Sequence, residues 1–160
     1  MPSSWDARHI VNLTLGKKFG KNWEAGVNWR FQSGLPFTPF SDQSALVSSW
    51  DVNARGIKDY SRLNTQRIEA SNTIDLRIDK KWFFKKWSLN IYLDIENITA
   101  NAVQIPNLIL DRPRDESGMP IGDGIIENPD APASEQRYKL KTIDDAQGTA
   151  IPSVGVMIEI

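Results

Sequence analysis

Positions 74–95 contain the sequence IDLRIDKKWFFKKWSLNIYLDI, which holds two runs of strictly alternating apolar and polar residues. A period of two residues indicates β-strands, because successive side chains leave a pleated strand on opposite sides. The centre of the stretch, from Lys80 to Trp87, consists of four lysines and four aromatic residues. The stretch therefore predicts a β-hairpin whose turn is both aromatic and basic.

The two faces of this hairpin differ in chemistry. One face carries isoleucine and leucine, and the other carries Arg77 among several carboxylates. A soluble sheet that buries one face and hydrates the other gives the same alternation. A transmembrane barrel gives it with the apolar face toward lipid and the charged face toward a wet lumen. The aromatic residues and lysines at the turn favour the barrel, because such side chains gather at the level of lipid head groups.

The same alternation recurs along the chain and predicts five strands, at about 8–19, 23–33, 72–82, 87–96 and 152–160. The turns after the first and third strands are short, but residues 34–71 and 97–151 form long, proline-containing loops without periodicity. Short turns at one rim and long loops at the other are typical of outer-membrane barrels. We therefore expect residues 1–160 to belong to one all-β domain of antiparallel up-and-down strands. In this interpretation the short turns are periplasmic, the two long loops are extracellular, and the five strands are part of a larger barrel.

The alternation assigns each strand residue to one side of this expected barrel. The residues expected to face the lumen are Glu24, Asn28, Arg30, Asp75, Arg77, Asp79, Asn90, Tyr92, Asp94 and Glu96. The residues expected to face lipid are Trp23, Val27, Trp29, Ile74, Leu76, Ile78, Trp87, Leu89, Ile91, Leu93, Val154, Val156 and Ile158.

Composition excludes several classes of protein. The formal net charge of −1 gives no field that would attract nucleic acid. No run of eighteen apolar residues is present, which excludes a helical membrane span but not a barrel strand. The sequence has no cysteine and a single histidine, His9, which excludes disulfides, zinc–thiolate sites and multi-histidine metal sites. The first residues have neither a basic region nor an apolar core, so if this is an outer-membrane protein we expect the chain not to be a complete precursor.

The candidates for site chemistry are few, and we expect no enzyme activity and no cofactor. Asp94 and Glu96 lie two apart on one face, as a pair of carboxylates for acid–base work would, but ion pairing across strands with Arg77, Lys81 or Arg30 explains them better. The acidic loop residues have no EF-hand spacing, so a solvated loop is favoured over a calcium site. These residues are Asp111, Asp115, Glu116, Asp123, Glu127 and Asp130.

Four segments carry a family resemblance. They are RFQSGLPFTP at 30–39, YSRLN at 60–64, DLRIDK at 75–80 and YLDIEN at 92–97. In this order they resemble the C-terminal barrel strands of TonB-dependent outer-membrane receptors of the Bacteroidetes type. The resemblance implies a barrel of about 22 strands with an N-terminal plug, placed in the cell outer membrane and importing a scarce ligand with energy passed on by a TonB-type transducer. It further implies that the remaining strands and the plug lie outside this chain. Ile160 departs from the aromatic residue on which the family often ends.

Aromatic and arginine side chains in the first long loop are candidates for ligand binding, because such residues are common anchors of recognition. They are Phe37, Phe40, Trp50, Arg55, Tyr60 and Arg62. Equally, Phe37 and Phe40 fit an outer aromatic girdle, or the loop packs on itself. Siderophore, cobalamin, peptide and glycan all remain open as the ligand.

The alternative to a receptor fragment is a self-contained soluble β-sheet binding module. Such a module would bury its apolar stripes in a sandwich or small barrel. The aromatic residues of the turn distinguish the two hypotheses. A soluble core would bury Trp82, Phe83, Phe84 and Trp87, and a membrane barrel would place them at the lipid boundary.

Overall fold

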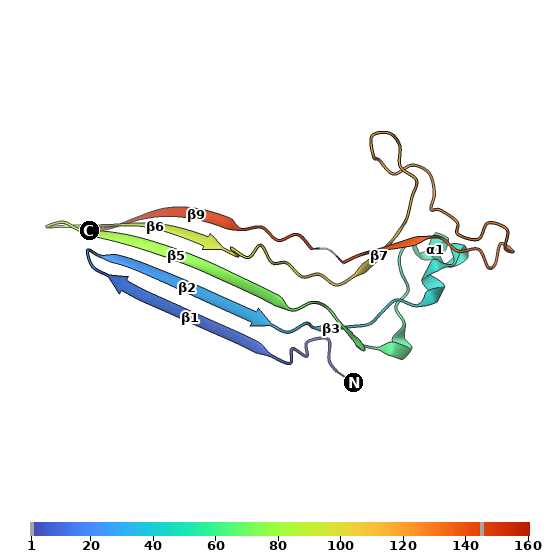
Figure 1. Ribbon diagram of the computed structural model, residues 1–160, viewed down its shortest axis with the longest axis horizontal. Coiled ribbons are helices and arrows are strands. Elements are labelled where there is room, and N and C mark those ends of the chain that lie inside the picture. The colour runs from blue at the N-terminus through green and yellow to red at the C-terminus, as the bar shows by residue number, and fades with distance from the viewer. Residues whose placement is uncertain (1, 145) are drawn as a thin grey trace. The chain divides into compact units, whose positions relative to one another are not determined.

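Five long strands form one antiparallel sheet in the computed structural model, in the order β1-β2-β5-β6-β9 (Figure 1). They are β1 (Ile10–Phe19), β2 (Trp23–Gln32), β5 (Ser71–Phe83), β6 (Ser88–Glu96) and β9 (Ile151–Glu159). Each begins and ends within about two residues of the range that alternation predicts. The five antiparallel strands and the all-β class are therefore as expected from the sequence.

The structure describes residues 2–144 and 146–160, and the chain divides into two units. The sheet unit comprises Asp6–Leu35, Glu69–Val103 and Ala146–Ile160, and it contains the five long strands. The loop unit comprises Met1–Trp5, Pro36–Ile68 and Gln104–Asp145, and it contains most of both long loops.

The register of the sheet separates apolar from polar side chains. Leu15 lies opposite Val27, and Val27 lies opposite Leu76 on the next strand. One position further along, Gly16, Gly26 and Arg77 form the corresponding row on the other side. Directly opposed residues share a face. The register therefore places the paired residues expected to face lipid on one face, the apolar face, and those expected to face the lumen on the other, the polar face. Trp87 lies in the turn before β6, outside the paired residues.

The sheet is a single layer in the described part of the chain. Every residue of β1 is exposed, and in β9 only Gly155 is partly buried. The exposed fraction is 60% for Leu15 and 73% for Val154, although both lie on the apolar face. The fold thus presents to its surroundings the kind of surface that soluble proteins normally cover.

The short turns lie at one end of the sheet, as predicted. β1 and β2 are joined through residues 20–22, and β5 and β6 through a turn in which the Phe84 amide donates to the Trp87 carbonyl (2.9 Å). Glu159 lies opposite Ser88, so β9 ends at the same rim. This follows from antiparallel pairing, because β1, β5 and β9 run in the same direction.

The loop unit contains short elements that periodicity did not predict. They are β3 (Pro36–Phe37), η1 (Asp42–Ala45), α1 (Val47–Asn53), η2 (Tyr60–Arg62), β4 (Gln66–Arg67), β7 (Asn107–Leu110) and β8 (Leu140–Ile143). β3 pairs with β4, and β7 pairs with β8. Elements of two to seven residues are too short to establish a hydrophobic period, which is why the sequence indicated only irregular loops. No helix in the described residues is long and apolar enough to cross a membrane.

A small core holds the loop unit together. Trp50 and Tyr138 are exposed by only 7% and 8%. The Ser44 hydroxyl is buried, donates to the Ile57 carbonyl (3.1 Å) and accepts from the Ile57 amide (2.8 Å). The Tyr138 amide donates to the Ala45 carbonyl (2.8 Å), which ties the second long loop to the first. Burial raises the pKa of Tyr138, and the neighbouring Asp51 carboxylate acts in the same direction.

Candidate functional site

A hydrogen-bonded network crosses the polar face of the sheet. The Asp75 carboxylate accepts from the Arg30 guanidinium (2.8 Å), from the Asn28 side-chain amide (3.2 Å) and from the Asn97 backbone amide (2.9 Å). Asn28 in turn accepts from the Thr14 hydroxyl (3.0 Å). The network therefore joins β1, β2 and β5 through side chains as well as through the backbone.

Arg77 is the centre of a second group on the same face. Its guanidinium donates two hydrogen bonds to Asp79 (2.9 and 3.0 Å), lies 3.6 Å from the Asp94 carboxylate and stacks over the Tyr92 ring at 4.1 Å. The ion pair with Arg77 is one of the pairings expected for Asp94.

Tyr92 lies over Gly155 of the neighbouring strand. A Cβ atom on Gly155 would collide with the Cζ, Oη and Cε1 atoms of the Tyr92 ring. Glycine in a strand often marks such a close approach. This close approach packs β9 onto β6 on the polar face.

Aromatic residues and lysines gather at the short-turn end of the sheet, where the register places Trp23, Lys80 and Trp82 on the apolar face. Phe84 and Trp87 stack with their ring centroids 4.1 Å apart. The Lys80 ammonium lies 5.1 Å from the centre of the Trp23 ring and 5.5 Å from that of Trp82. Phe83 differs, because the register places it opposite Ser88 on the polar face. The exposed fractions are 39% for Trp82, 49% for Phe84, 40% for Trp87 and 66% for Phe83, so the cluster is not a buried core.

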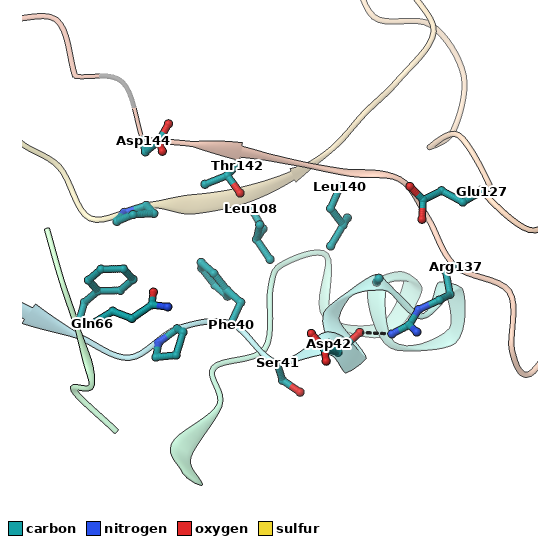
Figure 2. Close-up of a pocket in the computed structure, with 14 residues that line it drawn as sticks. Phe40, Ser41, Asp42, Gln66, Leu108, Glu127, Arg137, Leu140, Thr142 and Asp144 are labelled. Carbon is teal, nitrogen blue, oxygen red and sulfur yellow. Dashed lines mark hydrogen bonds between the residues drawn. The ribbon is translucent and has the colours of Figure 1, made fainter. Parts of the chain in front are cut away.

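The loop unit contains a pocket of about 720 Å³ between β7–β8 and the 37–45 segment (Figure 2). Phe40, Leu108 and Leu140 point into it, and Arg137 reaches across to donate to the Asp42 backbone carbonyl (2.6 Å). The carboxylates that line this first pocket belong to Asp42, Glu127 and Asp144. Its lining mixes apolar and polar residues, and its charges are mainly negative.

A second pocket, of about 660 Å³, shares Phe40 with the first. We call it the Phe40–Tyr60 pocket, and its charged lining residues are Arg55 and Lys58. Lys58 lies with its ammonium 3.6 Å from the centre of the Phe40 ring. Its lining thus combines two cations with ring surfaces.

The structure brings together only some of the candidate ligand residues. Phe37 and Phe40 line the first pocket, and Phe40, Arg55 and Tyr60 line the second. Trp50 belongs instead to the core of the loop unit, although its edge lines a further pocket beside Arg55. The remaining candidate, Arg62, forms an ion pair with Asp59 (2.6 Å).

Sequence reasoning did not identify Lys58, Glu127 or Arg137 as pocket residues. Lys58 and Arg137 belong to no motif, and Glu127 was considered only among the acidic loop residues weighed as a calcium site. Arg137 and its partner Asp42 are 95 positions apart. Lys58 and Phe40 are also well separated in the sequence, so their contact gave no local signal.

The acidic loop residues do not form a metal site in the described part of the chain, where no three histidine, cysteine, aspartate or glutamate side chains are grouped to hold an ion. The Asp115 carboxylate accepts hydrogen bonds from the Ser117 hydroxyl (2.7 Å) and the Met119 amide (2.8 Å), and the Ser117 bond contributes most to the lowered pKa of Asp115. Asp111 pairs with Lys139 (3.1 Å). His9 is exposed, and its backbone amide donates to the Ser33 hydroxyl (3.0 Å).

Comparisons of the chain with protein-family models, with curated proteins and with solved structures found no match.

Proposed function

We propose that this chain supplies strands and outward loops to the barrel of a TonB-dependent outer-membrane receptor that imports a scarce ligand. In this proposal the apolar face of the sheet contacts lipid and the polar face lines the lumen. The partners are the outer-membrane lipid, the other barrel strands, the plug and, through the plug, a TonB-type energy transducer. The loop unit contributes to ligand capture.

The observation that carries the proposal is the contrast between the two faces of one uncovered sheet. On the polar face Arg77 pairs with Asp79 and Asp94, and Arg30 pairs with Asp75. The apolar face has no such groups at mid-strand and is exposed. In water this exposed apolar surface would favour aggregation, but in a bilayer it needs no protein cover.

The rim of the apolar face supports the same proposal. Lys80 lies over Trp23 and Trp82, and Lys17 lies 5.5 Å from the centre of the Phe19 ring. A long lysine stem can follow apolar surface while its ammonium reaches the head groups, and indole rings prefer the same depth. The short-turn end of the sheet then corresponds to one membrane interface.

The two edge strands of the sheet indicate that a membrane barrel would need further strands. β1 and β9 each pair with a single neighbour in the sheet. Unpaired backbone groups in hydrocarbon cost several kcal/mol each, so membrane sheets close into barrels. We therefore propose that other strands of the receptor pair with both edges.

The test is fractionation of the source bacterium followed by detection with an antibody against residues 111–132. Most of this segment is exposed, so the epitope is accessible. The proposal predicts an outer-membrane signal that resists alkaline extraction and migrates several times larger than 18.1 kDa. A soluble species at 18.1 kDa would contradict it and support the self-contained β-sheet module.

Antibody binding to intact cells tests the orientation. If the long loops face outward, intact cells bind the antibody as strongly as permeabilised cells do. A signal that requires permeabilisation would place the loops on the periplasmic side and overturn the proposed topology. Competition with a peptide of residues 111–132 controls for specificity.

A further inference from the structure

We propose that the Phe40–Tyr60 pocket binds a carboxylate carried on a ring, and this inference rests on the proposed function because it names the ligand class that the loop unit captures. The shared chemistry is an anionic group beside a flat or ring-shaped apolar surface. Acidic sugars and aryl carboxylates both present it.

The charge of the pocket favours an anion. Arg55 and Lys58 are its charged lining residues, and no aspartate or glutamate lines it in the described part of the chain. The nearby Asp59 carboxylate is occupied by the Ser61 hydroxyl and the Arg62 guanidinium, each at 2.6 Å. The Arg55 guanidinium has no ion-pair partner within the described residues. Arg55 and Lys58 therefore line the pocket, and no carboxylate of the described residues lines it with them.

Lys58 is held in a position suited to binding. Its ammonium lies over the Phe40 ring, and the Phe40 ring is fixed against the backbone because a Cβ on Gly56 would lie 2.5 Å from Phe40 Cδ1. Partial burial lowers the pKa of Lys58. A carboxylate of the ligand would stabilise the charged ammonium at this site, because an opposite charge compensates for lost hydration.

The apolar walls favour a ring rather than a small inorganic anion. Tyr60 is 74% exposed and Ile105 is 59% exposed, although both line the pocket. Pro106 and Phe40 add further flat surface. A volume of about 660 Å³ lies within the usual range for small-ligand sites, about 300–1,000 Å³. Sugar and aromatic rings both pack on tyrosine and proline through their faces.

The neighbouring first pocket provides an internal contrast. It carries the carboxylates of Asp42, Glu127 and Asp144, and its arginine, Arg137, donates to a backbone carbonyl. An anionic ligand is repelled there and attracted to the Phe40–Tyr60 pocket. The loop unit thus has two sites of opposite charge preference that share one phenylalanine.

The test is titration calorimetry on the full chain in detergent micelles. The probes are trigalacturonate, an acidic sugar, and 3,4-dihydroxybenzoate, an aryl carboxylate. Neutral galactotriose and catechol control for the ring alone, and inorganic phosphate controls for charge alone. We expect one carboxylate probe to bind at least tenfold more tightly than its neutral counterpart and than phosphate. Binding of trigalacturonate would identify an acidic sugar as the ligand class, and binding of 3,4-dihydroxybenzoate would identify an aryl carboxylate.

Variants assign binding to this pocket. Arg55→Gln and Lys58→Gln each lower the affinity about tenfold, because charge-assisted hydrogen bonds are the stronger ones. Tyr60→Ala weakens the ring-bearing probe but leaves phosphate binding unchanged. Arg55→Lys and Lys58→Arg keep the charge and retain part of the affinity, which separates loss of charge from loss of folding. Arg112→Gln is the matched control, since Arg112 is an exposed arginine of the same unit outside this pocket.

Three results would overturn the inference. They are the absence of carboxylate binding at millimolar probe, equal binding of neutral and charged probes, and equal losses in Arg112→Gln and Arg55→Gln. The outcome is independent of the fractionation test. A chain found in the outer membrane without carboxylate binding refutes this pocket only, and a soluble chain that binds carboxylates refutes the receptor only.

Discussion

The sheet unit and the loop unit use apolar residues in opposite ways. In the loop unit Trp50 and Tyr138 are buried against other parts of the same unit. In the sheet unit Leu15, Val154 and Ile158 are at least 59% exposed on the apolar face. The loop unit therefore carries its own hydrophobic stabilisation. The sheet relies on backbone hydrogen bonds, on its polar face and on whatever medium meets its apolar face.

The largest expected effect comes from the core of the loop unit. Trp50→Ala should destabilise this unit by about 3–5 kcal/mol, because a buried aromatic ring leaves a cavity. Hydrogen exchange should speed up at the amides of α1 and of the β7–β8 pair, and the ladder of the sheet unit should keep its protection. Trp5→Ala is the control, since Trp5 is 85% exposed. Equal loss of protection in both units would contradict the prediction that Trp50 stabilises the loop unit alone.

A charge on either face of β9 tests the sheet unit. Val154→Arg should cost about 2–4 kcal/mol in lipid vesicles, because Val154 lies at mid-strand on the apolar face. Ser153→Arg, one residue away on the polar face, should be nearly neutral. Urea unfolding in vesicles measures both. If Val154→Arg proves as harmless as Ser153→Arg, the apolar face does not contact hydrocarbon.

Packing on the polar face should have a smaller effect. Gly155→Val should cost about 1–3 kcal/mol, because the new side chain overlaps the Tyr92 ring. Adding Tyr92→Ser should recover part of the loss. Gly16→Val is the matched control, since a Cβ there meets only the Ala25 carbonyl oxygen at 3.9 Å. A double-mutant cycle without coupling would show that Tyr92 does not hold β9.

The smallest expected effect concerns the exposed turn at η2. Hydrogen bonds from Ser61 and then from Arg62 lower the pKa of Asp59 below its ordinary value of 3.8. The ionised Asp59 carboxylate therefore stabilises the turn at pH values above its ordinary pKa. This stabilisation is lost as the pH falls through the lower pKa of the folded state. Water screens this exposed group, so overall unfolding should hardly change. An NMR titration measures the pKa of Asp59, and Ser61→Ala should move it back upward. An unchanged pKa would refute this role of Ser61.

The candidate site was predictable only in part. Phe40, Arg55 and Tyr60 were identified by residue type, and the structure places all three in one pocket. Trp50 was identified in the same way and lies in the core, because residue type does not distinguish an anchor from a packing residue. Lys58 and Arg137 were missed because their neighbours in space are set by the fold of two long loops.

Local patterns in the sequence were enough to predict the five strands, their alternating faces and the end at which the short turns lie. These features depend on a period of two and on antiparallel connection, and both are local properties of the chain. Tertiary packing, in contrast, determines which loop side chains meet, such as Arg137 with Asp42 across 95 positions. It also determines that Tyr92 covers Gly155. Such contacts follow from the packing of distant segments, and that packing leaves no period in the sequence.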